Sequence, residues 1–137
     1  MTKTNPARTG SAGTILTINP NSSKSVTAAI DLTVEPLRVA GGARIDVVDL
    51  LQGPLSIMTQ QDSDGAVMPL AALVKAHSAD AFVIACFSDH GLHAVREAAG
   101  GRPVIGIAEW GLLRAPTLGE RLASLRSRQT ASSVSTA

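Results

Sequence analysis

The sequence is poor in cysteine and in aromatic residues: its 137 residues include one cysteine, one tryptophan, two phenylalanines and no tyrosine. A single cysteine excludes an intramolecular disulfide and a cysteine-rich zinc site, so we expect a reducing, cytoplasmic compartment. So few aromatic rings argue against a surface on which nucleic-acid bases stack. The N-terminus lacks the apolar core of a secretory signal. The longest apolar runs have about seven residues, against the roughly 20 that cross a bilayer, so we expect no membrane association.

The chain also lacks a large excess of either charge, because its 12 Lys and Arg residues nearly balance its 11 Asp and Glu residues. This balance argues further against a nucleic-acid partner. Residues 1–13 and 121–137 contain no acidic residue and are rich in small polar ones. They cannot bury enough apolar surface to offset their ordering entropy, so we predict that both segments are disordered. Residues 14–120 remain as one small, mildly acidic domain.

Short apolar runs alternate with segments of helical period in this domain, which predicts an α/β fold with a four-stranded parallel sheet flanked by helices. The third run is the most apolar, which predicts a central strand, and the alternation in the second predicts a place nearer the edge. Pro69 predicts either a kink in the second helix or a helix that begins near it. The predicted strands span 14–19, 44–49, 81–86 and 102–107, and the predicted helices span about 23–38, 62–78, 92–99 and 109–115.

Polar residues follow the predicted strands, where ligands bind in open α/β sheets. Cys86 ends the third strand. A cysteine there is either a small buried hydrophobe or a reactive thiol. The amides of Phe87 and Ser88, placed by the pattern at a helix N-terminus, favour an anion and therefore a thiolate that acts as a base.

The asparagines after the first strand, Asn19 and Asn21, can donate to a carbonyl or imide oxygen, although a turn and a helix cap would also explain this loop. A zinc site formed by Cys86 with Asp89, His90 and His93 is a further interpretation, but we predict no metal. The glycines form no dinucleotide or phosphate loop, so no nucleotide cofactor is expected.

Three motifs follow one another along the chain: Ile18-Asn-Pro-Asn-Ser-Ser23, Ile84-Ala-Cys-Phe-Ser-Asp89 with Gly91-Leu92, and Pro103-Val-Ile-Gly-Ile107 with Glu109. Together they resemble the hydantoin racemase branch of the aspartate/glutamate racemase superfamily, from about Ile15 to Glu120. The resemblance implies one half of a two-half α/β fold and a cofactor-independent enzyme. In such enzymes one cysteine thiolate removes the proton alpha to a carbonyl, and a second thiol on the opposite face returns one.

Carried over by position, the resemblance makes Cys86 the first of the two catalytic cysteines. It makes Phe87 and Ser88 the donors to the enolate, and it places Asn19 and Asn21 in the loop that holds the polar groups of a hydantoin or a related amino-acid derivative. His90 departs from the family, which more often has proline at this position, and this leaves the geometry of the turn in question.

The resemblance implies a second half of the fold, with a second cysteine, that has no counterpart after Thr117-Leu-Gly-Glu-Arg121. We expect a truncated or frameshifted reading frame, which a downstream frame encoding an apolar strand and a Cys-Gly motif would support. The chain is then either inactive, limited to proton exchange on one face, or completed by a second copy that covers Trp110, Leu112 and Leu113. The alternative function is a non-catalytic module that binds a small carboxylate while Cys86 only packs.

Overall fold

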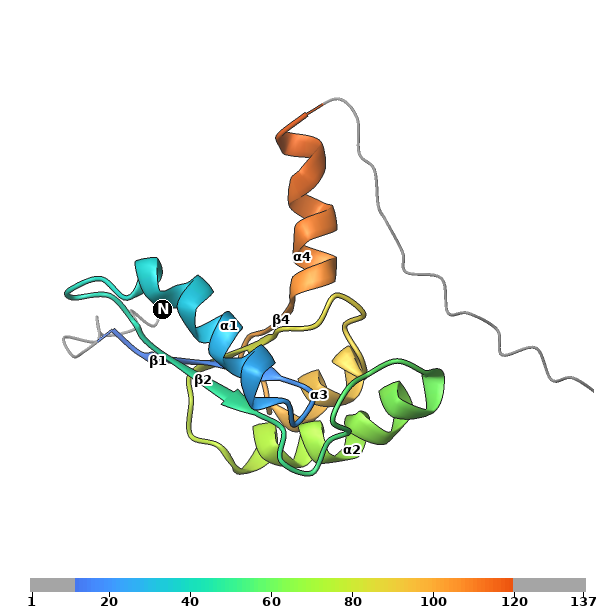
Figure 1. Ribbon diagram of the computed structural model, residues 1–137. Helices are drawn as coiled ribbons and strands as arrows, with labels where there is room; N and C mark the ends of the chain where they lie inside the picture. The colour runs from blue at the N-terminus through green and yellow to red at the C-terminus, as the bar shows by residue number, and fades with distance from the viewer. Residues whose placement is uncertain (1–11, 120–137) are drawn as a thin grey trace, which may run out of the picture.

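Four parallel strands form one sheet in the order β2-β1-β3-β4 (Figure 1). The structure is a computed structural model and describes residues 12–119, so the segments predicted to be disordered lie outside it apart from residues 12 and 13. The predicted α/β fold with a four-stranded parallel sheet is confirmed, with β1 and β3 in its centre and β2 at an edge. The strands are β1 (Thr14–Asn19), β2 (Arg44–Asp49), β3 (Ala81–Ile84) and β4 (Val104–Gly106).

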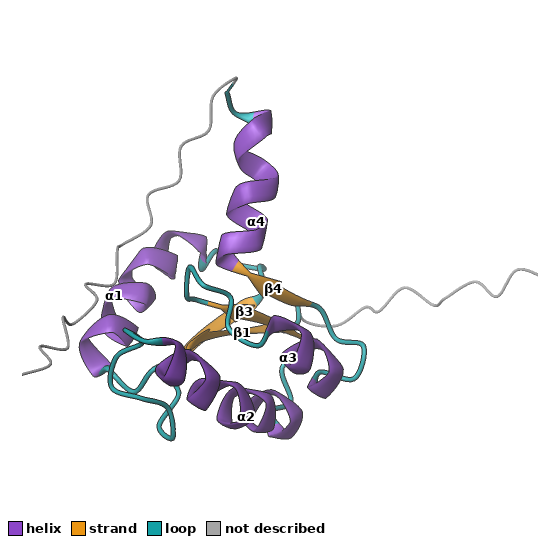
Figure 2. Cartoon of the chain, turned by 90° about the vertical axis from the view of Figure 1, so that its right-hand side faces the viewer, coloured by secondary structure: helices purple, strands orange, loops and turns teal. Residues whose placement is uncertain are grey.

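Helices connect the strands and lie on both faces of the sheet. Figure 2 shows α2 and α3 side by side beneath one face, α1 on the other side, and α4 rising away from β4. Between residues 12 and 119, no helix has both the length and the apolar character that crossing a bilayer requires. The helices are α1 (Lys24–Val34), α2 (Gln60–Ala76), α3 (Leu92–Ala98) and α4 (Ile107–Arg114), with 3-10 turns at Glu35–Leu37 and Ala115–Thr117.

Several element boundaries differ from the prediction. The first helix ends at Val34 and passes into the 3-10 turn at Glu35–Leu37, because Pro36 has no backbone N–H with which to continue the hydrogen bonds of an α-helix. The second begins at Gln60, where Thr59 and Asp62 form a capping box, and it continues through Pro69. Both β3 and β4 are shorter than predicted, so the cysteine predicted to end the third strand lies in the loop after it.

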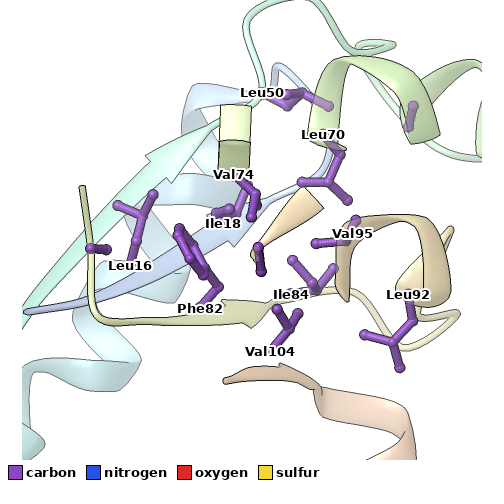
Figure 3. Packing of buried hydrophobic residues seen from close by; sticks show 13 residues of the cluster. Leu16, Ile18, Leu50, Leu70, Val74, Phe82, Ile84, Leu92, Val95 and Val104 are labelled. Carbon is purple, nitrogen blue, oxygen red and sulfur yellow. The ribbon is translucent and has the colours of Figure 1, made fainter. Parts of the chain in front are cut away.

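The hydrophobic core lies between the sheet and the pair α2 and α3. The strand register aligns Leu16 with Phe82, and Phe82 with Val104, so these side chains share one face of the sheet. Figure 3 shows them meeting side chains of the two helices, including Val74 and Val95. The sheet and these helices therefore fix the loops that leave the carboxyl ends of β1 and β3.

The opposite face of the sheet is covered less completely. Helix α1 has no fully buried residue. Of its apolar side chains at helical spacing, Val26 and Ala29 are exposed, and Ile30 and Val34 are half-buried. The helical period therefore predicts the helix but not how deeply it packs.

Candidate functional site

The candidate site lies at the carboxyl ends of β1 and β3, where the direction of the strand connections reverses. From β1 the chain turns to β2 on one side, and it then crosses to β3 on the other side of β1. Such a switch point is where open α/β sheets bind ligands. The backbone N–H of Ala85 donates to the carbonyl of Ile18 at 2.8 Å, which brings the loop after β1 and the loop holding Cys86 side by side.

Asn19 is turned inward and is only 1% exposed. Its Nδ2 faces Oδ1 of Asn21 at 2.7 Å, Oγ1 of Thr27 at 3.1 Å and the carbonyl of Ser23 at 3.3 Å. Its Oδ1 accepts the backbone N–H of Asn21 at 3.3 Å. Because two amide hydrogens already serve three acceptors, this side chain shapes the turn and has no donor left for a bound molecule.

The side chain of Asn21, unlike that of Asn19, has a hydrogen-bond donor left for a bound molecule. Its Oδ1 accepts the side-chain amide of Asn19 and the backbone N–H of Ser23, the latter at 3.0 Å. Its Nδ2 makes no hydrogen bond to any residue between 12 and 119, and the residue is half-buried. Of the two asparagines after β1, Asn21 is therefore the one whose side chain can donate to a carbonyl oxygen.

Cys86 lies two residues beyond the end of β3 and is half-buried. Its Sγ is 3.1 Å from Nε2 of His90. His90 is only 6% exposed, and this burial lowers the pKa of its imidazole, while the carboxylate of Asp89 acts in the opposite direction. The thiol therefore faces an imidazole that burial keeps neutral.

Phe87 and Ser88 follow the cysteine on the exposed side of the loop. In the described part of the chain, neither backbone N–H donates to another protein group. The sequence placed these amides at a helix N-terminus, which is wrong: α3 begins only at Leu92. Positive φ angles at Asp89 (45°) and Gly91 (59°) reverse the chain first, so the two amides belong to a turn. They remain available as donors to an anion.

Asp89 connects this loop to α4. Its Oδ1 accepts the N–H of Ala108 at 3.1 Å and its Oδ2 that of Glu109 at 2.6 Å, so the carboxylate caps the helix where the dipole favours negative charge. A Cβ at Gly106 would clash with the carboxylate of Asp89 in the position where it caps α4, so a larger residue there would have to displace the cap. Glu109, noted in the sequence as a residue after the fourth strand, pairs with Arg96 at 2.5 Å.

Sequence reasoning missed two contacts at this edge of the sheet. The sulfur–imidazole pair has a signal in the sequence, the spacing of four residues between Cys86 and His90, but only the turn at Asp89 brings the two together. Lys24 also pairs with Asp49 at 2.8 Å, and its hydrogen bond lowers the pKa of that carboxyl. The pair lies beside the loop after β1 and has no local signal, because 25 residues separate its members.

No group of three or more His, Cys, Asp or Glu side chains among residues 12–119 is placed to hold a metal ion. Of the four residues of the alternative zinc site, Cys86 and His90 are in contact. His93 is exposed, and the carboxylate of Asp89 is hydrogen-bonded to the start of α4. A hollow of ≈ 820 Å³ lies elsewhere, beside the start of β2, and its lining includes Arg38 and Arg44 but not the cysteine.

The family model described as Asp/Glu/Hydantoin racemase matches residues 15–136. A hydantoin racemase of Paenarthrobacter aurescens is 39% identical over 69% of this chain and 41% of its own length. A hydantoin racemase of Rhizobium meliloti is 38% identical over 76% of this chain and 44% of its own. The solved allantoin racemase from Klebsiella pneumoniae superposes with a TM-score of 0.70 at 36% identity, covering 77% of this chain and 44% of that one.

The chain thus spans less than half the length of the curated relatives it matches. The resemblance inferred from the three motifs is confirmed. The family model begins at Ile15, as expected, but it continues to residue 136, past Glu120, where the resemblance was expected to end. The chain belongs to the Asp/Glu/hydantoin racemase family.

Proposed function

We propose that Cys86 is the thiol base that removes the proton alpha to a carbonyl from a hydantoin-type ring, without a cofactor. The observation that carries this proposal is the place of the chain's one cysteine, half-buried at the switch point between β1 and β3. A thiol titrates close enough to neutral pH for general acid–base work, and its thiolate takes the proton. The names of the relatives favour this substrate class, since allantoin is itself a 5-substituted hydantoin.

Three donors in the loops after β1 and β3 fit the negative charge that develops on the ring oxygen when the proton leaves. The backbone amides of Phe87 and Ser88 have no acceptor among the described residues, and neither has Nδ2 of Asn21. Donors already in place at a developing oxyanion lower the barrier without reorganisation. Asn19, expected to contact the substrate, acts in this proposal through the turn that presents Asn21.

The proposed chemistry of this chain is proton exchange on one face of the ring. Two-base racemisation, as the resemblance implies it, needs a second cysteine, and the sequence has one. The chain then supplies one of the two acid–base groups that the resemblance implies. A reactive thiol also fits the reducing cytoplasm expected from the cysteine content.

The test is proton NMR of single enantiomers of a 5-substituted hydantoin in D2O with the purified chain. We expect the C5 proton signal to disappear faster than in the protein-free solution, while the optical rotation persists. Protein alkylated beforehand with iodoacetamide is the control and should match the protein-free rate. No exchange above that rate from a folded chain would overturn the proposal, and loss of rotation at the rate of exchange would show that a second acid completes the site.

The same free amides at Phe87 and Ser88 favour one alternative, a non-catalytic module that binds a small carboxylate. In that case Cys86 only packs, and a bound carboxylate changes the NMR spectrum of the protein without any exchange at C5. The half-buried position of the thiol and its contact with His90 favour the catalytic function.

We propose in addition that a second copy of the chain covers α4. Trp110, Leu112 and Leu113 are exposed by 53%, 43% and 62%, and adjacent exposed apolar side chains mark interaction surfaces. We expect sedimentation velocity to show a dimer whose population falls when Leu113→Glu places a charge in that surface. A wild-type chain that stays monomeric at every concentration tested would contradict this.

A further inference from the structure

We propose that His90 is the proton acceptor that converts the Cys86 thiol into the thiolate, an inference that rests on the proposed function. The geometry is a sulfur–nitrogen contact of 3.1 Å between Sγ and Nε2. A hydrogen bond of this length lets a proton pass between the two atoms without movement of the backbone. Nothing in the motifs that identify the family assigns a role to this histidine.

The surroundings of His90 leave its ring in the neutral form, the form that can accept a proton. The side chain is almost fully buried, and desolvation lowers its pKa, so the ring is neutral at physiological pH. The charged group that acts on it is Asp89, whose carboxylate is held by the N–H groups of Ala108 and Glu109. The tautomer with its proton on Nδ1 directs the lone pair of Nε2 at the sulfur.

The step is a proton transfer with no other co-reactant. The Sγ–H bond breaks, the electron pair stays on sulfur, and an Nε2–H bond forms, which gives a thiolate beside an imidazolium. The carboxylate of Asp89 favours that imidazolium and offsets part of the effect of burial, which lowers the pKa of the ring and opposes the charge. The thiolate then takes the C5 proton of the ring and becomes a thiol again.

A structural role for His90 is the competing interpretation, since the contact with Cys86 could simply hold the loop. The two roles separate in His90→Gln, because a glutamine amide can hydrogen-bond the thiol but cannot accept its proton. His93→Gln is the matched control: His93 lies three residues further along the chain and is exposed.

The experiment measures the rate at which iodoacetamide alkylates Cys86 in the full chain, from about pH 5 to about pH 9, a range that spans the ordinary titration of imidazole and thiol. For the wild type and His93→Gln, we expect the rate to rise with pH and to level off near neutral pH. For His90→Gln, we expect a rate about tenfold lower at pH 7, rising until the pH passes the ordinary thiol range near 8.5. Circular dichroism verifies that each variant is folded.

Equal pH profiles for His90→Gln and the wild type would overturn the role of His90 while leaving the proposed function intact, because the alkylation involves no substrate. Failure of the proposed function has a different signature: normal alkylation profiles combined with no exchange at C5 of a hydantoin. If His90→Gln fails to fold, His90→Asn and titration of the thiolate absorbance of the wild type against Cys86→Ser give the same comparison. A thiolate that appears only above about pH 8 in the wild type would refute the transfer.

Discussion

Cys86→Ser is expected to lower the rate of C5 proton exchange by about a hundred- to ten-thousand-fold, the usual contribution of a positioned acid–base group. Serine preserves the size of the side chain and its hydrogen bond to Nε2 of His90. A serine hydroxyl is a far weaker acid than a thiol, so the imidazole cannot convert it into a base. The expected loss is therefore chemical, and the stability of the fold should change little, since the cysteine is only half-buried.

Exchange is measured by NMR in D2O at equal concentrations of the wild type, Cys86→Ser and the control His93→Gln. His93→Gln should exchange at the rate of the wild type, because the side chain is exposed and contacts neither the thiol nor its partner. A serine variant that exchanges within about threefold of the wild type would remove the thiol from the mechanism. The residual exchange would then point to another base.

Phe82→Ala is expected to lower the free energy of unfolding by about 3–5 kcal/mol, a large part of the roughly 5–15 kcal/mol that stabilises a domain. Phe82 is 1% exposed and lies on the central strand β3, between Leu16 and Val104 in the register. Its ring also lies 4.7 Å below the guanidinium of Arg102, whose N–H groups donate to the carbonyls of Val74 and Ala99. Removing the ring therefore opens a cavity and takes away the cation–π contact with Arg102.

Urea denaturation followed by circular dichroism measures the change, and Phe87→Ala is the matched control. Phe87 has the same side chain but is 59% exposed, so its truncation should change the stability by about 0.5 kcal/mol or less. Equal losses in the two variants would contradict the core described here. A Phe82→Ala chain that does not fold at all would agree with the direction but exceed the expected size.

The fold could be predicted from the sequence because its signals are local. The apolar run at residues 81–86 and the alternation at 44–49 predict strands, and the contrast between them predicts which one is central. The positions at which helices begin and end depend also on packing between distant parts of the chain. Pro69 lies inside α2, where the capping box of Thr59 and the packing of Leu70 and Val74 on the sheet outweigh the cost of the proline.

The candidate site could be predicted in its location but not in its contacts. The residues after β1 and β3 were found because ligands bind at strand ends, yet the sequence could not show that Asn19 turns inward while Asn21 keeps a free donor. It offered His90 only as a ligand in the alternative zinc site and did not predict its direct contact with Cys86, because that contact depends on a left-handed backbone at Asp89, a non-glycine residue. Local propensity carries little information about one such residue.

The carboxylate of Asp89 joins the loop that holds Cys86 to the start of α4. Its two oxygens hold the first amides of α4, and its backbone lies within the turn from Cys86 to Gly91. We therefore expect a tilt of α4 to change the distance between Sγ of Cys86 and Nε2 of His90. Binding of a partner to the exposed tryptophan and leucines of α4 should then be measurable as a change in the rate at which Cys86 is alkylated.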